Sequence, residues 1–139
     1  MPMVVDASVA ISWCLPDESN DYARQALLAL RGGEAGIVPQ LWPTEVANAL
    51  VIAKRRGRIS EPDVNRAASL LGGLGVQLMQ IELTASLGEV RQLAEATALT
   101  AYDASYVHLA IRENAALATL DERLRVAAAA AGCRVFEPA

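Results

Sequence analysis

The chain has 139 residues, a length that suits one domain and leaves little room for a second. Hydrophobic residues make up 53% of it and aromatics only 4%, so we expect a core built from Ala, Leu, Val and Ile. The net charge of -4 argues against a protein that coats nucleic acid by charge alone. It does not exclude an enzyme whose acidic site is neutralised by a bound cation.

Several other classes of protein are excluded by single features. Cys14 and Cys133 stand far apart and form no CxxC pair, which predicts neither a zinc site nor a disulfide and favours a cytoplasmic setting. The first residues do not resemble a signal peptide, and no apolar run approaches the ~18 residues of a membrane helix. The single histidine, His108, excludes RNA cleavage by a histidine pair. We expect it to be an ordinary residue on an apolar helix face.

The first half of the chain is predicted to alternate short buried strands with helices. The apolar run Met3–Val5 ends at Asp6 and indicates a buried strand. Ser19 or Asn20 is placed to cap a helix, and Pro43 suits the first turn of another. The expected elements are strands over 3–5 and 36–38, and helices over 7–15, 20–32 and 43–56.

The second half continues this alternation. The segment Ser60–Asp63 has the pattern of a capping box, and an apolar run before Asp121 again indicates a strand that ends at an acid. The expected elements are helices over 61–73, 84–98, 100–114 and 122–131, and strands over 76–81, 116–120 and 134–136. Together they predict an α/β fold in three layers, α/β/α, around a central, mainly parallel five-stranded sheet.

Two acids follow predicted strands directly. Ligands of open parallel sheets bind beyond the carboxyl ends of the strands, and Asp6 and Asp121 would meet there if their strands are neighbours. The alternative is that each carboxylate only caps the helix that follows it.

Two further acids lie beside apolar helix positions. Glu45 shares a helix stripe with Trp42 and Ala49, and a carboxylate beside buried positions needs a partner or a metal. Asp103 lies on a helix face with Tyr106, although Thr100 and Asp103 also fit a capping box with Asp in place of Glu. A glutamate that simply reaches solvent and a capping aspartate therefore remain open as alternatives.

The four acids together point to a metal-dependent reaction. Four carboxylates cannot share a site without a cation, because their charges would raise one another's pKa until some of them protonated. Mg²⁺ and Mn²⁺ accept such oxygen ligands and also bind substrate phosphate. A site of this kind suits hydrolysis of a phosphodiester bond.

At these residues the chain resembles PIN-domain proteins, and among them the VapC toxins of toxin–antitoxin pairs. The resemblance covers essentially the whole chain, as a single PIN-like nuclease domain over residues 1–139. It is carried by four segments in order: Val4–Ser8, Trp42–Leu50, Leu99–Tyr106 and Leu117–Asp121.

The resemblance implies RNA cleavage by an endoribonuclease that uses Mg²⁺ or Mn²⁺ and leaves a 5′-phosphate and a 3′-hydroxyl. It implies that the first and fourth strands are adjacent. The residues that match the acidic quartet of the family, as catalytic residues and metal ligands, are Asp6, Glu45, Asp103 and Asp121. Those expected to orient the carboxylates or water are Ser8, Asn48 and Thr119. The implied partners are RNA, a second copy of the chain in a homodimer, and a VapB-like antitoxin through which alone DNA would be bound.

Other interpretations remain open at this stage. Asp6 would be the nucleophile of an aspartyl phosphotransferase or phosphatase, but Ser8 stands where such enzymes usually carry a second Asp. A catalytically silent, partner-binding PIN-like module is the non-enzymatic alternative. The basic run Lys54–Arg58 suits RNA phosphates or simply the negative end of a helix dipole. Trp13 and Trp42 are expected in the core or a dimer interface rather than stacked on bases.

Overall fold

A four-stranded parallel sheet organises the computed structural model, which describes all residues from 1 to 139. Its strands are β1 (Met3–Val5), β2 (Gly36–Pro39), β3 (Gln77–Met79) and β4 (Ala116–Ala118), in the order β3-β2-β1-β4. β1 is central, with Val4 opposite Ile37 on one side and Leu117 on the other. The resemblance had implied the adjacency of β1 and β4, and the structure confirms it.

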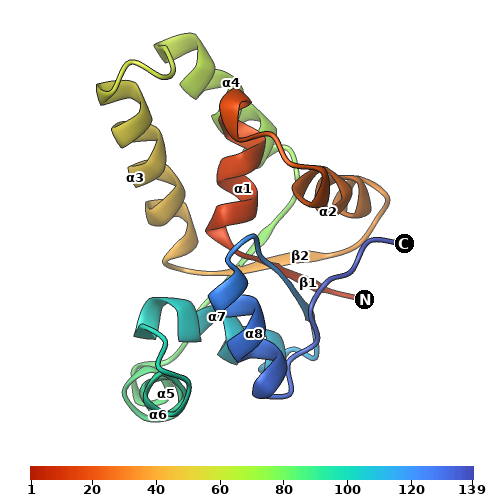
Figure 1. Cartoon of the computed structure of the whole chain (residues 1–139), viewed down its shortest axis with the longest axis vertical. Coiled ribbons are helices and arrows are strands. Elements are labelled where there is room, and N and C mark those ends of the chain that lie inside the picture. Colours follow the sequence, from red (N-terminus) through yellow and green to blue (C-terminus); the bar gives the residue numbers. More distant parts are fainter.

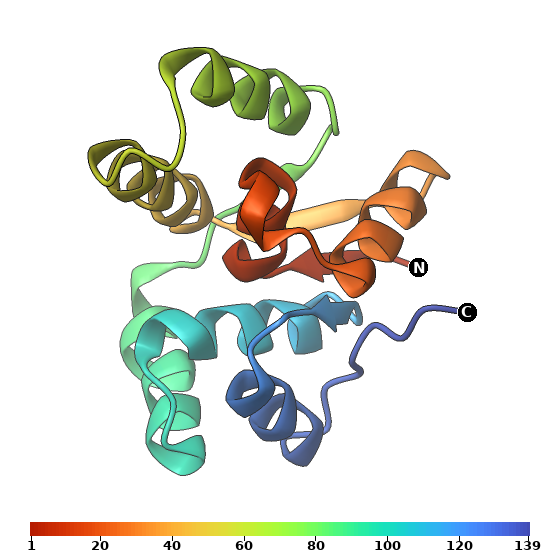
Figure 2. The ribbon, with the colours of Figure 1, turned by 45° about the horizontal axis from the view of Figure 1, so that its top comes forward.

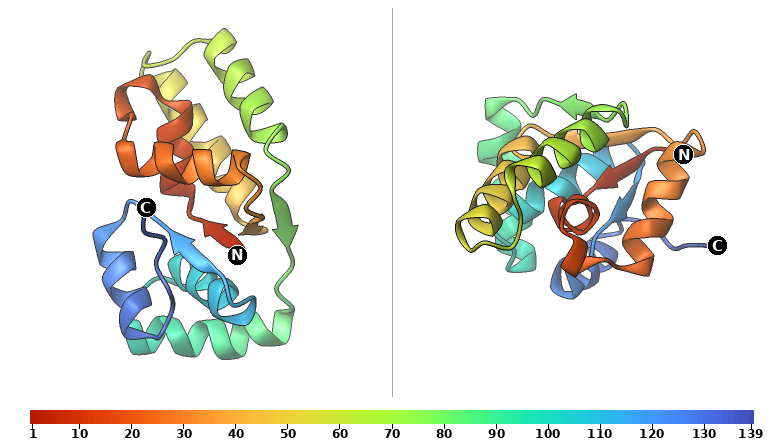
Figure 3. Two further views of the ribbon diagram at one scale, coloured as in Figure 1. Left: turned by 90° about the vertical axis from the view of Figure 1, so that its right-hand side faces the viewer. Right: turned by 90° about the horizontal axis from the view of Figure 1, so that it is seen from above.

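Helices cover both faces of this sheet (Figure 1). One layer holds α1 (Ala7–Cys14), the 3₁₀ turn η1 (Pro16–Glu18), α2 (Asp21–Arg31), α3 (Trp42–Arg55) and α4 (Glu61–Gly72). The other holds α5 (Leu83–Ala85), the π-helical turn η2 (Ser86–Val90), α6 (Arg91–Thr97), α7 (Ala101–Arg112) and α8 (Glu122–Ala130). Figures 2 and 3 show the strands between these two layers, so the expected three-layer α/β/α architecture is confirmed.

The core is aliphatic, as the composition predicts. Val4, Val5 and Leu117 in the central strands are completely buried, because a parallel sheet is covered on both faces. Leu109 and Tyr106 of α7 lie against the same core with no exposed surface. Tyr106 is the one aromatic side chain that is completely buried, and its position becomes important at the site.

The predicted fifth strand, over residues 134–136, is wrong as a strand. Only Val135 pairs with the sheet, through a single parallel bridge to Leu117 at the edge of β4. The Phe136 carbonyl oxygen accepts a hydrogen bond from the Tyr22 hydroxyl instead of a strand partner, and Pro138, which has no N–H, follows close behind. Both features stop the segment from extending the ladder.

The predicted helix over 84–98 is continuous but not uniform. It begins at Leu83 and includes the π turn η2 before α6 begins. Within this turn the Glu89 carboxylate meets the ring of His108 on α7, at 2.9 Å from Nε2. The π turn is therefore located where a side chain of the helix reaches the neighbouring helix.

Local signals for helix starts are largely confirmed. The Asn20 side chain accepts a hydrogen bond from the Ala23 N–H, and Ser60 and Asp63 form the expected capping box. Both cysteines are buried free thiols. None of the helices has the length and apolar character needed to cross a membrane.

The Tyr22 hydroxyl ties α2 to the C-terminal segment, and we expect its removal to be measurable. Tyr22→Phe should lower the free energy of unfolding by about 1 kcal/mol, the usual contribution of one hydrogen bond, while the edge contact between the rings of Tyr22 and Phe136 persists. Urea denaturation followed by circular dichroism measures this loss. Tyr102→Phe is the matched control, because the exposed Tyr102 hydroxyl makes no hydrogen bond, and a loss of equal size there would contradict the assignment.

Candidate functional site

The carboxyl edge of the sheet holds the acids that follow β1 and β4. The backbone N–H of Asp6 donates to the carbonyl oxygen of Ala118, so the two strand ends are directly hydrogen-bonded where the acids begin. The Asp6 side chain is only 6% exposed, whereas Asp121 is exposed at the mouth of the same edge. Burial of Asp6 is unusual for a carboxylate without a cationic partner.

Two hydroxyl groups hold the buried carboxylate of Asp6. Ser8 Oγ donates to Asp6 Oδ2 over 2.6 Å, and Thr119 Oγ1 donates to the same oxygen over 2.8 Å. Each hydroxyl accepts a backbone N–H in turn, from Leu120 and Asp121 respectively. These donors fix the direction of both hydroxyl protons, and they leave Oδ1 of Asp6 without a side-chain partner.

Burial raises the pKa of Asp6 above its ordinary value of 3.8, and the charge of Asp121 adds to this effect. The hydroxyls of Ser8 and Thr119 and the backbone N–H of Ala7 act in the opposite direction by stabilising the charged form, but they do not cancel the effect of burial on the pKa. The site therefore contains a charge that the protein alone only partly compensates.

Glu45 enters the same region from the first turn of α3. Its side chain is half-buried, and its Oε1 accepts a hydrogen bond from the hydroxyl of Tyr106 on α7. Burial raises the pKa of Glu45, and the charges of Asp6 and Asp103 add to this effect. Tyr106 is the functional candidate that the sequence reasoning missed, since it was counted only among the apolar neighbours of Asp103. The available signal was its place one helical turn after that acid.

Asp103 uses only half of the predicted capping box. Its backbone N–H donates to Thr100 Oγ1, but its carboxylate makes no hydrogen bond back to the start of the helix. Burial raises the pKa of Asp103, helped by the charges of Asp6 and Asp121 and opposed by Arg123. Both of its carboxylate oxygens are thus left available to a ligand.

Asp121 does cap its helix, as the simpler interpretation proposed. Its Oδ1 accepts the N–H of Leu124, which leaves Oδ2 free. The next acid, Glu122, is not part of the group, because it pairs with Arg125 on the following turn of α8. Asn48 is exposed one turn beyond Glu45 and makes no side-chain hydrogen bond, so the structure does not link it to the carboxylates.

In every pair except Glu45 and Asp121, the charge of one acid raises the pKa of the other, but the four do not form a finished coordination sphere. No three Asp, Glu, His or Cys side chains converge closely enough to enclose a metal ion as they stand. The chemistry of the donors nevertheless fits a hard divalent cation: oxygen ligands only, with at least one oxygen of each carboxylate free of side-chain donors. Burial first, and the charges of the neighbouring acids second, raise the pKa values of Asp6, Glu45 and Asp103, and a bound cation would favour their charged forms.

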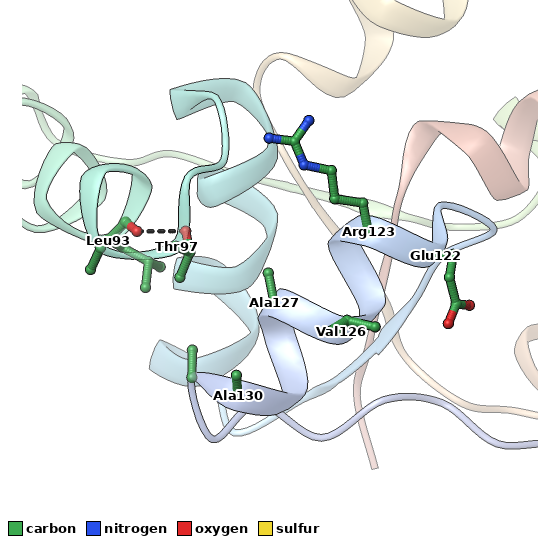
Figure 4. A pocket seen from close by; sticks show the side chains of 9 residues that line it. Leu93, Thr97, Glu122, Arg123, Val126, Ala127 and Ala130 are labelled. Atoms are coloured by element: carbon green, nitrogen blue, oxygen red, sulfur yellow. Dashed lines mark hydrogen bonds between the residues drawn. The ribbon is translucent and has the colours of Figure 1, made fainter.

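The largest cavity of the molecule is a separate feature. It is a groove of about 1000 Å³ between α6 and α8, lined by apolar side chains such as Leu93, Val126 and Ala130. Figure 4 shows Arg123 at its rim, extending away from Ala130, with Glu122 pointing in another direction. The groove holds none of the four acids, so its size does not identify it as the reaction site.

Comparisons with known proteins show the family to which the chain belongs. A family profile described as PIN domain matches residues 3–130. VapC ribonuclease Mb0985 of Mycobacterium bovis is 37% identical over 123 residues, which cover 88% of this chain and 87% of that protein. Ribonuclease VapC9 of Mycobacterium tuberculosis matches with the same identity and coverage.

A solved structure, PAE2754 from Pyrobaculum aerophilum, has the same fold. It superposes with a TM-score of 0.71 at 24% sequence identity, over 91% of this chain and 84% of that one. The family profile and the identity to VapC proteins over most of the length together establish the relationship. The chain belongs to the PIN-domain family, as a protein of the VapC type.

Proposed function

We propose that this chain is an endoribonuclease that depends on Mg²⁺ or Mn²⁺ and acts as the toxin of a VapBC-like pair. The observation that carries the proposal is the group of four electrostatically coupled carboxylates at the carboxyl edge of the sheet, in a chain that is 37% identical to proteins named VapC ribonucleases. The names of those relatives support the class of substrate, and the acids support the class of reaction.

Asp6, Glu45, Asp103 and Asp121 would hold the cation. Once bound, it supplies a water nucleophile at neutral pH and neutralises charge on the phosphate. Ser8 and Thr119 direct one oxygen of Asp6 inward and leave the other free, and Tyr106 does the same for Glu45. These hydrogen bonds fix carboxylate orientation before substrate arrives, which is how surrounding groups tune a metal site.

The partners follow from the same proposal. A VapB-like antitoxin would block the site and provide the contact with DNA, and the toxin itself would form a homodimer. An excess of negative charge at the site suits an Arg or Lys side chain contributed by the antitoxin. The alternative of an aspartyl phosphotransferase is disfavoured, because Asp6 is almost fully buried and two hydroxyls already bond one of its oxygens.

Cleavage of RNA by the purified chain should require the metal and Asp6. We expect cleavage of a mixed pool of structured RNAs with Mg²⁺ or Mn²⁺, none in EDTA, and a loss of more than about 100-fold in Asp6→Asn. Glu122→Gln is the matched control and should retain activity, because the Glu122 carboxylate already forms an ion pair with Arg125. Cleavage that survives EDTA or Asp6→Asn would sink the metal-carboxylate mechanism.

The same substitution should stabilise the metal-free protein. Because the folded state raises the pKa of Asp6 above 3.8, the folded protein holds this proton more tightly than the unfolded chain does. The stability contributed by Asp6 is therefore greatest at low pH and falls as the pH rises from about 3.8 to the raised value. In EDTA we expect Asp6→Asn to melt higher than wild type, by an amount that grows over this pH window and then levels off.

Thermal melts in EDTA across this pH range measure that difference. In a chain of this size, a change of 1 kcal/mol in the free energy of unfolding shifts the melting temperature by roughly 3–5 °C. Asp17→Asn is an opposite-sign control, because a hydrogen bond from Arg58 lowers the pKa of Asp17, so its substitution should cost more as the pH rises. Saturating Mn²⁺ should raise the melting temperature of wild type more than that of Asp6→Asn. Equal shifts would argue against Asp6 as a ligand.

Tyr106→Phe tests whether the hydrogen bond from the Tyr106 hydroxyl fixes the orientation of the Glu45 carboxylate. The substitution removes the hydroxyl donor but keeps the buried ring, so the fold should survive while the carboxylate becomes free to reorient. We expect Mn²⁺ affinity, measured by calorimetry, to fall by about 10-fold or more, with a matching loss of cleavage rate. Tyr102→Phe on the same helix is the control and should change neither quantity, because it keeps the aromatic ring and removes only an exposed hydroxyl that makes no hydrogen bond.

A further inference from the structure

The cations of this chain fall into two groups. One lysine and six of the eleven arginines form ion pairs with carboxylates, among them Lys54 with Glu61 and Arg58 with Asp17 and Glu18. The arginines without a carboxylate partner are Arg31, Arg55, Arg56, Arg123 and Arg134. In a chain of net charge -4, these five are the positive charges most available to a polyanion.

Three of the five lie on helices that carry the acids. Arg123 is two residues after Asp121 in the first turn of α8, and its guanidinium donates to the carbonyl oxygen of Ala98 just before α7. Its charge reaches Asp103 on that helix. No other cation acts on the pKa of Asp6, Glu45 or Asp103.

Arg55 and Arg56 lie at the far end of α3. Arg56 is the eleventh residue after Glu45, which puts it within about 20° of the same line on the helix and about 16 Å further along its axis. Between them the surface is open, since Asn48 and Ile52 are exposed. Part of the basic run Lys54–Arg58 is thus connected to the acids by one uninterrupted face of α3.

An exposed aromatic ring is next to one of the acids in the sequence, in the first turn of α7. Tyr102 is 66% exposed and immediately precedes Asp103, whereas the other five aromatic side chains, including Trp13 and Trp42, are buried or half-buried. A bare ring beside a nucleic-acid site accepts the face of an unpaired base, and a duplex offers no such face.

From this arrangement we infer that single-stranded RNA crosses the acids along a track from Arg55 and Arg56 on α3 to Arg123 and Tyr102. The arginines bind phosphates and Tyr102 stacks on a base. The inference rests on the proposed function for its substrate class, and it adds the surface that binds that substrate.

The two remaining free arginines provide the contrast. Arg31 ends α2 before β2 begins, and Arg134 bonds to Asn114 just before β4. Both are therefore at the amino ends of the parallel strands, on the edge of the sheet opposite the acids. They have the same side chain as the arginines of the track, but we do not expect them to contact the RNA.

Binding can be measured without cleavage in the Asp6→Asn background, using a short fluorescein-labelled single-stranded RNA of random sequence and fluorescence anisotropy between 50 and 200 mM KCl. Removing one arginine that binds a phosphate should reduce the slope of log affinity against log salt by about 0.7. On the same basis we expect a reduction of about 1.4 for the double variant Arg55→Gln with Arg56→Gln, and about 0.7 for Arg123→Gln. Tyr102→Ala should weaken binding by about 5- to 100-fold with the slope unchanged.

Because Arg123 also donates a hydrogen bond to Ala98, Arg123→Gln could act through the structure and not through phosphate binding. Arg123→Lys tells the two effects apart: it keeps the positive charge and should restore the salt dependence of binding. The control double variant Arg31→Gln with Arg134→Gln should bind like the background protein. An unchanged slope in both track variants, or an equal reduction in the control, overturns the inference, as does duplex RNA that binds as tightly as the single strand. RNA cleavage by the wild-type chain is scored separately, so the track can fail while the nuclease activity stands.

Discussion

The parallel pairing of β1 with β4 is the contact on which the acidic site depends. It bonds the Asp6 N–H to Ala118 and so brings Thr119, 113 residues away, within 2.8 Å of the Asp6 carboxylate. Parallel strands present their carboxyl ends at one edge, so helices α1 and α8 both begin there. The position of Asp6, its two hydroxyl partners and the neighbouring Asp121 are all consequences of this single strand pairing.

Electrostatic repulsion is the second constraint, and it opposes the strand pairing that brings the acids together. Burial and mutual repulsion raise the pKa values of Asp6, Glu45 and Asp103, so assembling these acids costs stability in the absence of a cation. The hydroxyls of Ser8 and Thr119 offset part of that cost at Asp6. The strain is of the kind that proteins retain where function requires it.

The elements that follow from local chemistry could be predicted from the sequence. The caps at Asn20 and Ser60 and the strand ends at Asp6 and Asp121 depend on a few adjacent residues. The predicted strand over 134–136 failed because its pairing depends on Tyr22, more than one hundred residues away, which takes the Phe136 carbonyl. The π turn escaped prediction for the same reason, since it accompanies the distant contact between Glu89 and His108.

The hydrogen bond between Glu45 and Tyr106 could not be read from spacing either, and it has a structural meaning of its own. Helical periodicity placed each residue near buried positions, but α3 and α7 belong to opposite layers of the fold (Figure 3). Their hydrogen bond therefore bridges the two layers beyond the edge of the sheet. Because Asp6 directly follows strand β1, and Asp103 and Glu45 belong to opposite layers, the site is assembled where the two helical layers meet at the edge of the sheet. Any change in how the layers meet would move Glu45 relative to the other acids, and the buried hydroxyl of Tyr106 is the group that resists it.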